Sequence, residues 1–299
     1  MSELRIGIVG LGIMGTAYAR NLIQAGFTVT GFDVSQAQSD ALADLGGCAV
    51  DSVQAVAERS DVILVVLASV KALQDCTIQL AQNIGPHHTI CEMGTFSLEQ
   101  KLEFQSRLNT KTTSVLDCPV SGTGAQAAAG DLSIYVSGDE TAANRVKPVF
   151  GTMARDIRYI GPFGTGTKLK FIANLLVTVH NLAAAEALLM AQQSDMDLQM
   201  VYDAICEGAG TSRMFEVRGP MMIAETYKPA TMKLDVYMKD LQLIADHARE
   251  INCPTPLMAA SIPHYVAGMA QGRQEEDTAA LFGILQQLIR SSQETEPKS

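Results

Sequence analysis

The sequence is poor in basic residues. Lys and Arg number 22 against 32 Asp and Glu, which gives a formal net charge of -10. A chain with this excess of negative charge has no overall attraction for phosphate backbones, so the composition argues against a nucleic-acid partner. Hydrophobic residues make up 47% and charged residues 18% of the chain. These fractions are typical of a folded globular protein with ample core material.

The sequence also lacks the patterns of metal sites, disulfide scaffolds and membrane segments. Its 6 cysteines include no C-x-x-C pair, so we expect reduced thiols and no metal. The longest stretch without Asp, Glu, Lys or Arg, residues 251–272, contains Pro254, Pro256 and Pro263, which argue against a membrane-spanning helix. The residues after Met1 lack the basic and apolar succession of a signal peptide. We therefore expect a cytoplasmic protein with no membrane partner.

Short apolar runs alternate with amphipathic segments in the first half of the chain. The runs are residues 4–9, 27–32, 61–67, 89–91 and 114–116. They are nearly continuous in Val, Ile and Leu, as expected for parallel strands that helices cover on both faces. Residues 132–136 and 157–160 resemble further strands of the same sheet. The pattern predicts an α/β fold, with a Rossmann-like, doubly wound and mostly parallel sheet.

The second half contains long helical patterns instead. Ile172, Leu175, Val179 and Leu182 recur at helical spacing and predict a long helix from about residue 167 to about residue 195. We therefore expect an all-α C-terminal domain joined to the sheet by this helix. The expected boundaries are 1–162 for the sheet domain, 163–290 for the all-α domain, and 291–299 for a flexible polar tail.

A glycine-rich loop follows the first predicted strand. It reads G-x-G-x-x-G and opens a helical pattern at residues 16–25, so the helix N-terminus can offer N–H groups to a pyrophosphate. An ordinary glycine turn is the alternative. Asp33 ends the next strand, where a carboxylate can bind ribose hydroxyls and repel a 2′-phosphate, although it could also cap the following helix. We expect NAD as the cofactor, bound by Gly10, Leu11, Gly12, Ile13, Met14, Gly15 and Asp33.

Three further segments carry polar groups of less specific meaning. Ser121, Gly122 and Thr123 follow the run that ends at residue 116, at the carboxyl edge of the sheet, where open α/β sheets bind ligands. Lys170 and Asn174 are four residues apart and project from one helical face. Met238-Lys239-Asp240-Leu241 could be the start of a salt-bridged helix. A connecting loop and surface residues are the alternatives for these segments.

Together, the four segments resemble the β-hydroxyacid dehydrogenase family, which includes 3-hydroxyisobutyrate dehydrogenase, tartronate semialdehyde reductase and L-threonate dehydrogenase. The resemblance covers about residues 5–289 through G-L-G-x-M-G, D-x-P-V-S-G, G-x-x-G-x-G-x-x-x-K-x-x-x-N and K-D-L, in the order of the family. It implies a Rossmann-like domain, a long helix and an all-α domain, assembled as a homodimer or homotetramer.

The resemblance also implies roles for individual residues. Lys170 matches the catalytic acid/base, and Asn174 matches the asparagine that orients the substrate. Ser121 and Gly122 match the residues that hold the substrate carboxylate, and Thr123 stands where the family usually has glycine. Lys239 matches a lysine beside cofactor and substrate, where its charge could lower the pKa of the catalytic lysine.

Two loops of the cofactor site depart from the family pattern. The usual Pro-Asn reads Ala68-Ser69, so contacts to the cofactor from Leu67 and Ala68 are expected through the backbone. The usual Asp-x-Ser-Thr reads Glu92-Met93-Gly94-Thr95, which keeps Thr95 near the nicotinamide.

The helical domain is similar to the L-threonate dehydrogenase branch in one stretch. Gly210-Thr211-Ser212-Arg213-Met214-Phe215 matches a Gly-x-Ser-x-Met-Phe pattern that borders the substrate in that branch. The match favours a small polyhydroxylated acid. Arg213 could bind a distal anionic group of such an acid, with an ordinary surface arginine as the alternative.

Two classes of function remain in consideration. The first is an NAD-dependent oxidoreductase that transfers a hydride between a small hydroxy acid, of the 3-hydroxyisobutyrate, tartronate semialdehyde/glycerate or threonate type, and nicotinamide. The second is a catalytically idle NAD-binding module with an oligomerising helical domain, against which Lys170 and Asn174 argue. Imine reductases share the scaffold but usually lack the lysine, so Lys170 argues against them too.

Overall fold

The computed structural model describes residues 4–109 and 114–294. The chain divides into two compact units, Met1–Lys170 and Phe171–Ser299, here called unit 1 and unit 2. The division falls inside a helix that begins at Thr165, so the first turn of this helix belongs to unit 1. The folding boundaries expected at residues 162/163 and 290/291 stay predictions.

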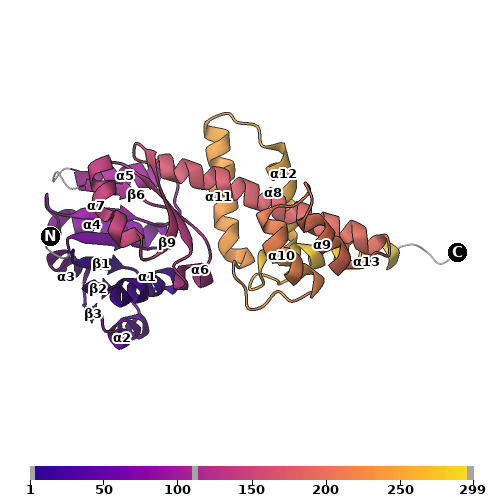
Figure 1. The fold of residues 1–299 in the computed structure, drawn as a ribbon. Coiled ribbons are helices and arrows are strands. Elements are labelled where there is room, and N and C mark those ends of the chain that lie inside the picture. The colour runs from indigo at the N-terminus through magenta and orange to yellow at the C-terminus, as the bar shows by residue number, and fades with distance from the viewer. Residues whose placement is uncertain (1–3, 110–113, 295–299) are drawn as a thin grey trace. The chain divides into compact units, whose positions relative to one another are not determined.

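Unit 1 is built on one mixed sheet with helices on both sides (Figure 1). The described strands occur in the order β3-β2-β1-β4-β5-β6-β8-β7, with β9 paired to β8. Strands β3 to β6 of this order are parallel, β8 is antiparallel to β6 and β7, and β9 is parallel to β8. The bounds are β1 Ile6–Val9, β2 Val29–Phe32, β3 Cys48–Ala49, β4 Val62–Val65, β5 Thr89–Glu92, β6 Ser114–Asp117, β7 Val120–Ser121, β8 Leu132–Ser137 and β9 Ala154–Gly161.

The helices of unit 1 alternate with these strands as the pattern of apolar runs predicts. Their bounds are α1 Ile13–Gln24, α2 Gln36–Asp44, α3 Val53–Glu58, α4 Val70–Asn83, α5 Leu98–Leu108, α6 Gly124–Ala128 and α7 Glu140–Phe150. The predicted α/β class and Rossmann-like sheet are confirmed, and the two late strands do extend the sheet as β8 and β9.

The central strands supply two cores, one on each face of the sheet. In β4, Val62 and Leu64 belong to one buried cluster, whereas Ile63 and Val65 belong to the other. Successive side chains of a strand point to opposite faces, so a strand covered on both faces must be apolar throughout. This requirement explains the continuous Val, Ile and Leu runs.

The sequence pattern did not predict two short strands, β3 and β7. Strand β3 has 2 residues, both exposed at the sheet edge, and β7 has 2 half-buried residues. Segments this short carry no detectable period, and only pairing with β2 and β8 makes them strands.

Unit 2 consists of helices in its described part. The bounds are α8 Thr165–Gln193, α9 Leu198–Cys206, α10 Arg213–Ile223, α11 Leu234–Glu250, α12 Pro256–Ala270, the short 3-10 helix η2 Thr278–Ala280 and α13 Leu281–Glu294. The predicted long helix is confirmed as α8. Helix α13 continues to Glu294, into the segment expected to be a tail, and residues 295–299 lie outside the described residues.

Helix α8 is long and apolar enough to cross a membrane by length and composition alone. Two of its polar side chains, Thr178 and Asn181, are however buried and bonded within unit 2. The Asn181 side chain donates to the Thr278 carbonyl oxygen (2.9 Å), and the Thr178 and Tyr237 hydroxyls lie 2.9 Å apart. Because these partners come from η2 and α11, the contacts indicate a central helix of a packed unit.

A bidentate ion pair joins the starts of β1 and β4. The Arg5 guanidinium donates to both Asp61 carboxylate oxygens (3.1 and 2.8 Å), and the Arg5 backbone N–H donates to the same carboxylate (3.0 Å). The side-chain bond from Arg5 lowers the pKa of Asp61 from 3.8 to about 2. The carboxylate therefore stabilises the fold above its unfolded pKa, and this stabilisation is lost as the pH falls toward about 2.

We expect Asp61→Asn to lower the free energy of unfolding at pH 7 by about 1 kcal/mol or less, because the pair is partly screened by solvent. The difference from wild type should shrink between pH 4 and pH 2, where wild type itself loses the charge. Urea unfolding at a series of pH values measures this, with Asp75→Asn, in a more exposed pair, as the control. A deficit that persisted unchanged at pH 2 would contradict the assignment.

Candidate cofactor and substrate site

Two glycines of the loop after β1, Gly10 and Gly15, are required by the packing of the protein itself. Gly10 has φ +98°, and a Cβ there would lie 2.2 Å from the Val66 carbonyl oxygen. A Cβ on Gly15 would lie 2.0 Å from the Gly10 carbonyl oxygen. Both positions therefore require glycine for the turn and for close packing of α1 on the sheet.

Gly12 is different because a Cβ there would meet no atom within 4 Å. Packing within the protein does not explain this glycine, whereas the close approach of a ligand would. Gly12 is also the N-cap of α1, and no side chain caps the first turn of that helix. The N–H groups of this turn are available to an anion, so the loop fits the pyrophosphate of a dinucleotide.

Asp33 lies beside this loop at the end of β2. Its carboxylate accepts hydrogen bonds from the backbone N–H groups of Leu11 (2.7 Å) and Ser35 (2.9 Å). The N-cap of α2 is Ser35, so capping does not account for Asp33. The apolar side chains of Ile13, which begins α1, and Val34, which follows Asp33, are 81% and 94% exposed, so a ligand could cover them.

The loops after β4 and β5 adjoin each other at the same edge of the sheet. A Cβ on Gly94 would lie 2.7 Å from the Leu67 carbonyl oxygen, so the two loops are in close contact. Ala68 is exposed, and Thr95 is half-buried. The Gly94 N–H donates to Oε1 of Glu92 (2.7 Å), which fixes the chain immediately before Thr95.

The segment after β6 forms a short strand and then a capped turn. Ser121 ends β7 opposite Ser133, and Gly122 has φ +145° with a leucine side chain where a Cβ would be. The Thr123 N–H donates to Oε1 of Gln126 (3.0 Å), and the Thr123 hydroxyl accepts from the Gln126 N–H (3.4 Å). Thr123 therefore caps α6, and its expected role toward a substrate stays a prediction beside this structural one.

A buried group of charges beneath these loops was not anticipated from the sequence. Lys101 Nζ lies 2.7 Å from Oδ1 of Asp117 and 2.5 Å from Oε2 of Glu92, and none of the three side chains is exposed. Asp117 also accepts the Thr167 N–H and hydroxyl, both at 2.8 Å. Burial raises the pKa of Glu92, and the two carboxylates raise the pKa of Lys101 despite its burial.

The two lysines at the start of α8 differ in burial. Lys170 is 9% exposed, whereas Lys168 is exposed. Lysine is rarely buried to this extent, so Lys170 is the more informative of the two residues.

Asn174 lies one turn further along α8, in unit 2. Its side-chain amide donates to Oδ2 of Asp240 (2.9 Å), and both side chains are buried. Asp240 belongs to the K-D-L stretch, which lies inside α11 and is not a helix start. Asp240 was not among the predicted site residues. Its spacing from Leu234, Tyr237 and Ile244 places it on the buried face of α11, which is the signal that could have found it.

Two predicted substrate residues of unit 2 are exposed. Arg213 begins α10, and its guanidinium pairs with Glu216 at 3.0 Å. Lys239 lies on the exposed face of α11. Among residues 4–109 and 114–294, no group of three or more His, Cys, Asp or Glu could hold a metal ion.

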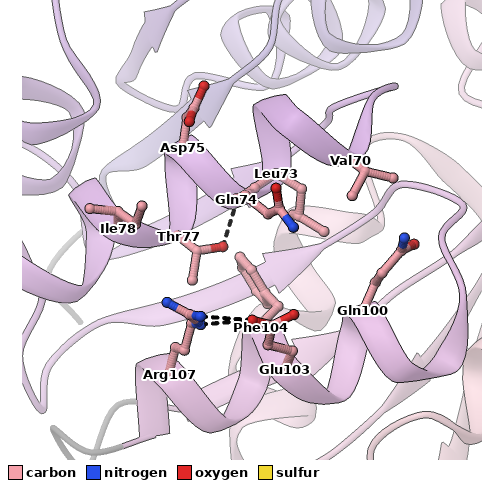
Figure 2. A pocket seen from close by; sticks show the side chains of 10 residues that line it. All are labelled: Val70, Leu73, Gln74, Asp75, Thr77, Ile78, Gln100, Glu103, Phe104 and Arg107. Carbon is pink, nitrogen blue, oxygen red and sulfur yellow. Dashed lines mark hydrogen bonds and ion pairs between the residues drawn. The ribbon is translucent and has the colours of Figure 1, made fainter.

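A groove of about 270 Å³ lies elsewhere, between α4 and α5 (Figure 2). Its lining includes none of the predicted site residues. The Arg107 guanidinium in this groove pairs with Glu103 (2.8 Å), and the Thr77 hydroxyl donates to the Leu73 carbonyl oxygen (2.6 Å). These polar groups are satisfied within their own helices, so they show no sign of a ligand site.

Comparison with known families covers almost the whole chain. Residues 5–161 match the NAD binding domain of 6-phosphogluconate dehydrogenase, and residues 164–285 match the family described as NAD-binding of NADP-dependent 3-hydroxyisobutyrate dehydrogenase. These matches define the class of the protein, an NAD(P)-binding dehydrogenase with a Rossmann-like domain followed by a helical one.

Individual relatives agree with this class. The chain is 31% identical over 288 residues to L-threonate dehydrogenase of Pectobacterium atrosepticum, covering 95% of this chain and 94% of the relative. It is 31% identical to 2-hydroxy-3-oxopropionate reductase of Escherichia coli, covering 95% and 97%. The crystallised 3-hydroxyisobutyrate dehydrogenase of Mycobacterium tuberculosis, studied with L-serine, superposes with a TM-score of 0.87 at 27% identity, covering 95% and 99%.

The chain therefore belongs to the β-hydroxyacid dehydrogenase family, in its 3-hydroxyisobutyrate dehydrogenase-like group. The resemblance predicted from the four sequence segments is confirmed, and so is an NAD(P) cofactor.

Proposed function

We propose that the protein is an NAD-dependent dehydrogenase that oxidises a small hydroxy acid, of the kind named in its L-threonate dehydrogenase relatives. The observation that carries this proposal is the buried Lys170 at the start of α8, one turn before Asn174. A dinucleotide-binding module without catalysis would need no buried lysine there. The exposed groups around the glycine loop supply the cofactor half of the proposal.

In the proposed reaction, Lys170 Nζ takes the hydroxyl proton of the acid during oxidation and returns it during reduction. The bound nicotinamide supplies the acceptor for the hydride that leaves the carbinol carbon. Asn174 orients the substrate, and Asp240 holds the Asn174 amide in a single orientation through its hydrogen bond of 2.9 Å. The protein thus contributes position and proton transfer.

The choice of NAD over NADP is proposed from Asp33. Its carboxylate is fixed by the Leu11 and Ser35 N–H groups at the end of β2, where an adenosine ribose would lie. Residues 34–40 contain no arginine that could pair with a 2′-phosphate. Leu67, Ala68 and Thr95 are proposed to line the remainder of the cofactor site.

The substrate is proposed to be small, polyhydroxylated and negatively charged. Ser121 and Gly122 would hold its carboxylate. Arg213 would leave its ion pair with Glu216 and bind a distal polar or anionic group of the substrate. The relatives named for L-threonate and for 2-hydroxy-3-oxopropionate support a short acid of this class.

We expect Ser121→Ala to lower kcat/KM for the preferred acid by roughly 10–150-fold, because it removes one charge-assisted hydrogen bond worth about 1.5–3 kcal/mol. The affinity for NAD should stay nearly unchanged. Rates with each acid and its methyl ester test the anchor directly: wild type should strongly prefer the acid, and Ser121→Ala should reduce that preference. Equal turnover of acid and ester by wild type would exclude a carboxylate anchor.

Assembly with further copies of the chain is proposed from α8. Ile172, Leu176 and Met190 of this helix are 61%, 48% and 72% exposed, an apolar stripe that water would otherwise cover. We propose a homodimer or homotetramer in the cytoplasm that buries this stripe. Light scattering coupled to size exclusion measures the mass, and a concentration-independent monomer would contradict the proposal.

The function itself is tested by incubating the protein with NAD and a panel of short hydroxy acids, including threonate, glycerate and 3-hydroxyisobutyrate. We expect NADH absorbance to rise with at least one acid of this class. A protein that binds NAD by calorimetry, yet oxidises no acid and reduces no corresponding semialdehyde, would be the idle module instead.

A further inference from the structure

The buried charges around Lys101 connect two parts of unit 1 that the proposed reaction requires to be in place. Each carboxylate paired with Lys101 also accepts hydrogen bonds from a neighbouring segment. One segment is the loop that carries Thr95, and the other is the start of α8 that carries Lys170. The ammonium of Lys101 is the single cation described between them.

The first connection runs through Glu92, the last residue of β5. Its Oε2 pairs with Lys101 Nζ at 2.5 Å, and its Oε1 accepts the Gly94 N–H at 2.7 Å. The side chain therefore spans from helix α5 to the residue immediately before Thr95. The two carboxylate oxygens of Glu92 thus contact different segments, one from α5 and one from the loop after β5.

The second connection runs through Asp117, the last residue of β6. Oδ1 accepts Lys101 Nζ (2.7 Å) and the Thr167 hydroxyl (2.8 Å), and Oδ2 accepts the Thr167 N–H (2.8 Å) and the Ser137 hydroxyl (3.1 Å). The Ser137 hydroxyl in turn accepts the Gly166 N–H at 3.0 Å. Two N–H groups of the first turn of α8 are thus held by unit 1.

These bonds fix the direction in which Lys170 projects. Thr167 and Lys170 are three residues apart, so they lie on the same face of α8. A helix whose first turn is bonded at Gly166 and Thr167 cannot rotate about its axis without breaking those bonds. The orientation of Lys170 is therefore set by Asp117, whose Oδ1 Lys101 Nζ contacts at 2.7 Å.

We infer that Lys101 is a positioning residue. It fixes the loop that carries Thr95 through Glu92, and the first turn of α8 that carries Lys170 through Asp117. This inference rests on the proposed function, because it assigns Lys101 a role in aligning the proton acceptor with the cofactor loop. Without Lys101, two buried carboxylates face each other with no counter-charge. Repulsion between the two carboxylates would force them apart, and a displaced Asp117 would no longer accept the Thr167 N–H and hydroxyl.

The loss of alignment should appear in turnover rather than in binding. A displacement of about 1 Å between reacting groups can lower a rate on the order of 100-fold. We therefore expect Lys101→Met to lower kcat about 100-fold, with KM for the acid and Kd for NAD changed by less than about threefold. Lys71→Met, which removes an exposed lysine from α4, is the matched control and should leave all three constants unchanged.

A second variant keeps the inference testable if Lys101→Met, with its two uncompensated carboxylates, fails to accumulate as folded protein. The double variant Lys101→Met, Glu92→Gln has the same formal charge in the cluster as wild type, and the glutamine side chain can still accept the Gly94 N–H. We expect it to fold and to lose about tenfold in kcat because the connection is absent. A folded double variant with the kcat of wild type would overturn the inference and leave Lys101 a purely structural role.

A measurement without substrate separates this inference from the proposed function. Amide hydrogen exchange of residues 164–170 should be faster in either Lys101 variant than in wild type or Lys71→Met. Exchange in the glycine loop, residues 10–15, should stay the same. If wild type oxidises no hydroxy acid, the proposed function fails, and the exchange result still decides: unchanged protection at residues 164–170 would overturn the positioning by Lys101.

Discussion

Lys170→Met should lower kcat for oxidation of the preferred hydroxy acid by about 10²–10⁴-fold, the usual contribution of a general acid/base. Methionine has a similar length and no ionisable group, so it removes proton transfer with little change in packing. The N-terminal turn of α8 should remain in place because its bonds to Asp117 and Ser137 involve Gly166 and Thr167. Steady-state kinetics measure the loss, and calorimetry should give an almost unchanged Kd for NAD.

Lys168→Met is the matched control for this variant. The same substitution lies two residues earlier on the same helix, but Lys168 is exposed. We expect activity within about twofold of wild type, as for most exposed positions. Equal losses in the two variants would show that proton transfer involves another group and that the face of α8 carrying Lys170 is wrongly assigned.

Wild type should prefer NAD over NADP on the order of 100-fold in kcat/KM, and Asp33→Asn should remove most of this preference. At about 5 Å and an effective dielectric constant of about 20, the repulsion between one carboxylate and one phosphate charge is about 3 kcal/mol. Asparagine removes the charge and keeps one carbonyl oxygen, which can still accept the Leu11 N–H.

The control for Asp33 is Asp40→Asn, which removes an exposed carboxylate from α2. It should leave the ratio of the two cofactors unchanged. Comparable kcat/KM values of wild type with NAD and NADP would contradict the role of Asp33. Thermal unfolding of both variants shows whether the loss of one accepted hydrogen bond has altered the fold.

Most of the sheet could be predicted from the sequence because its central strands are buried on both faces. Strands β1 and β4 contain no polar side chain, and such strands in alternation with helices leave few other folds. The short edge strands β3 and β7 could not be predicted, because 2 residues form a strand only through a neighbour that is distant in sequence.

Two buried charged residues of the candidate site were not predicted, because charged residues are usually exposed. Lys101 lies among polar neighbours and resembles a surface residue, yet it shares the buried face of α5 with Phe104 and Leu108. Asp240 is hidden in the same way on α11. Both residues stand at helical spacing from buried apolar residues of their own helix, and this pattern is the sequence signal for a buried charge. Their partners could not be predicted, because the partners come from other strands and helices.

The unit boundary between Lys170 and Phe171 lies within one continuous helix. A helix rises about 1.5 Å per residue, so Lys170 and Asn174 are separated by about 6 Å along the axis of α8. The proposed proton acceptor and the residue proposed to orient the substrate are therefore held at a fixed spacing by one helix. Insertion of a single residue between them would rotate Asn174 by about 100° away from Lys170 without shortening the helix.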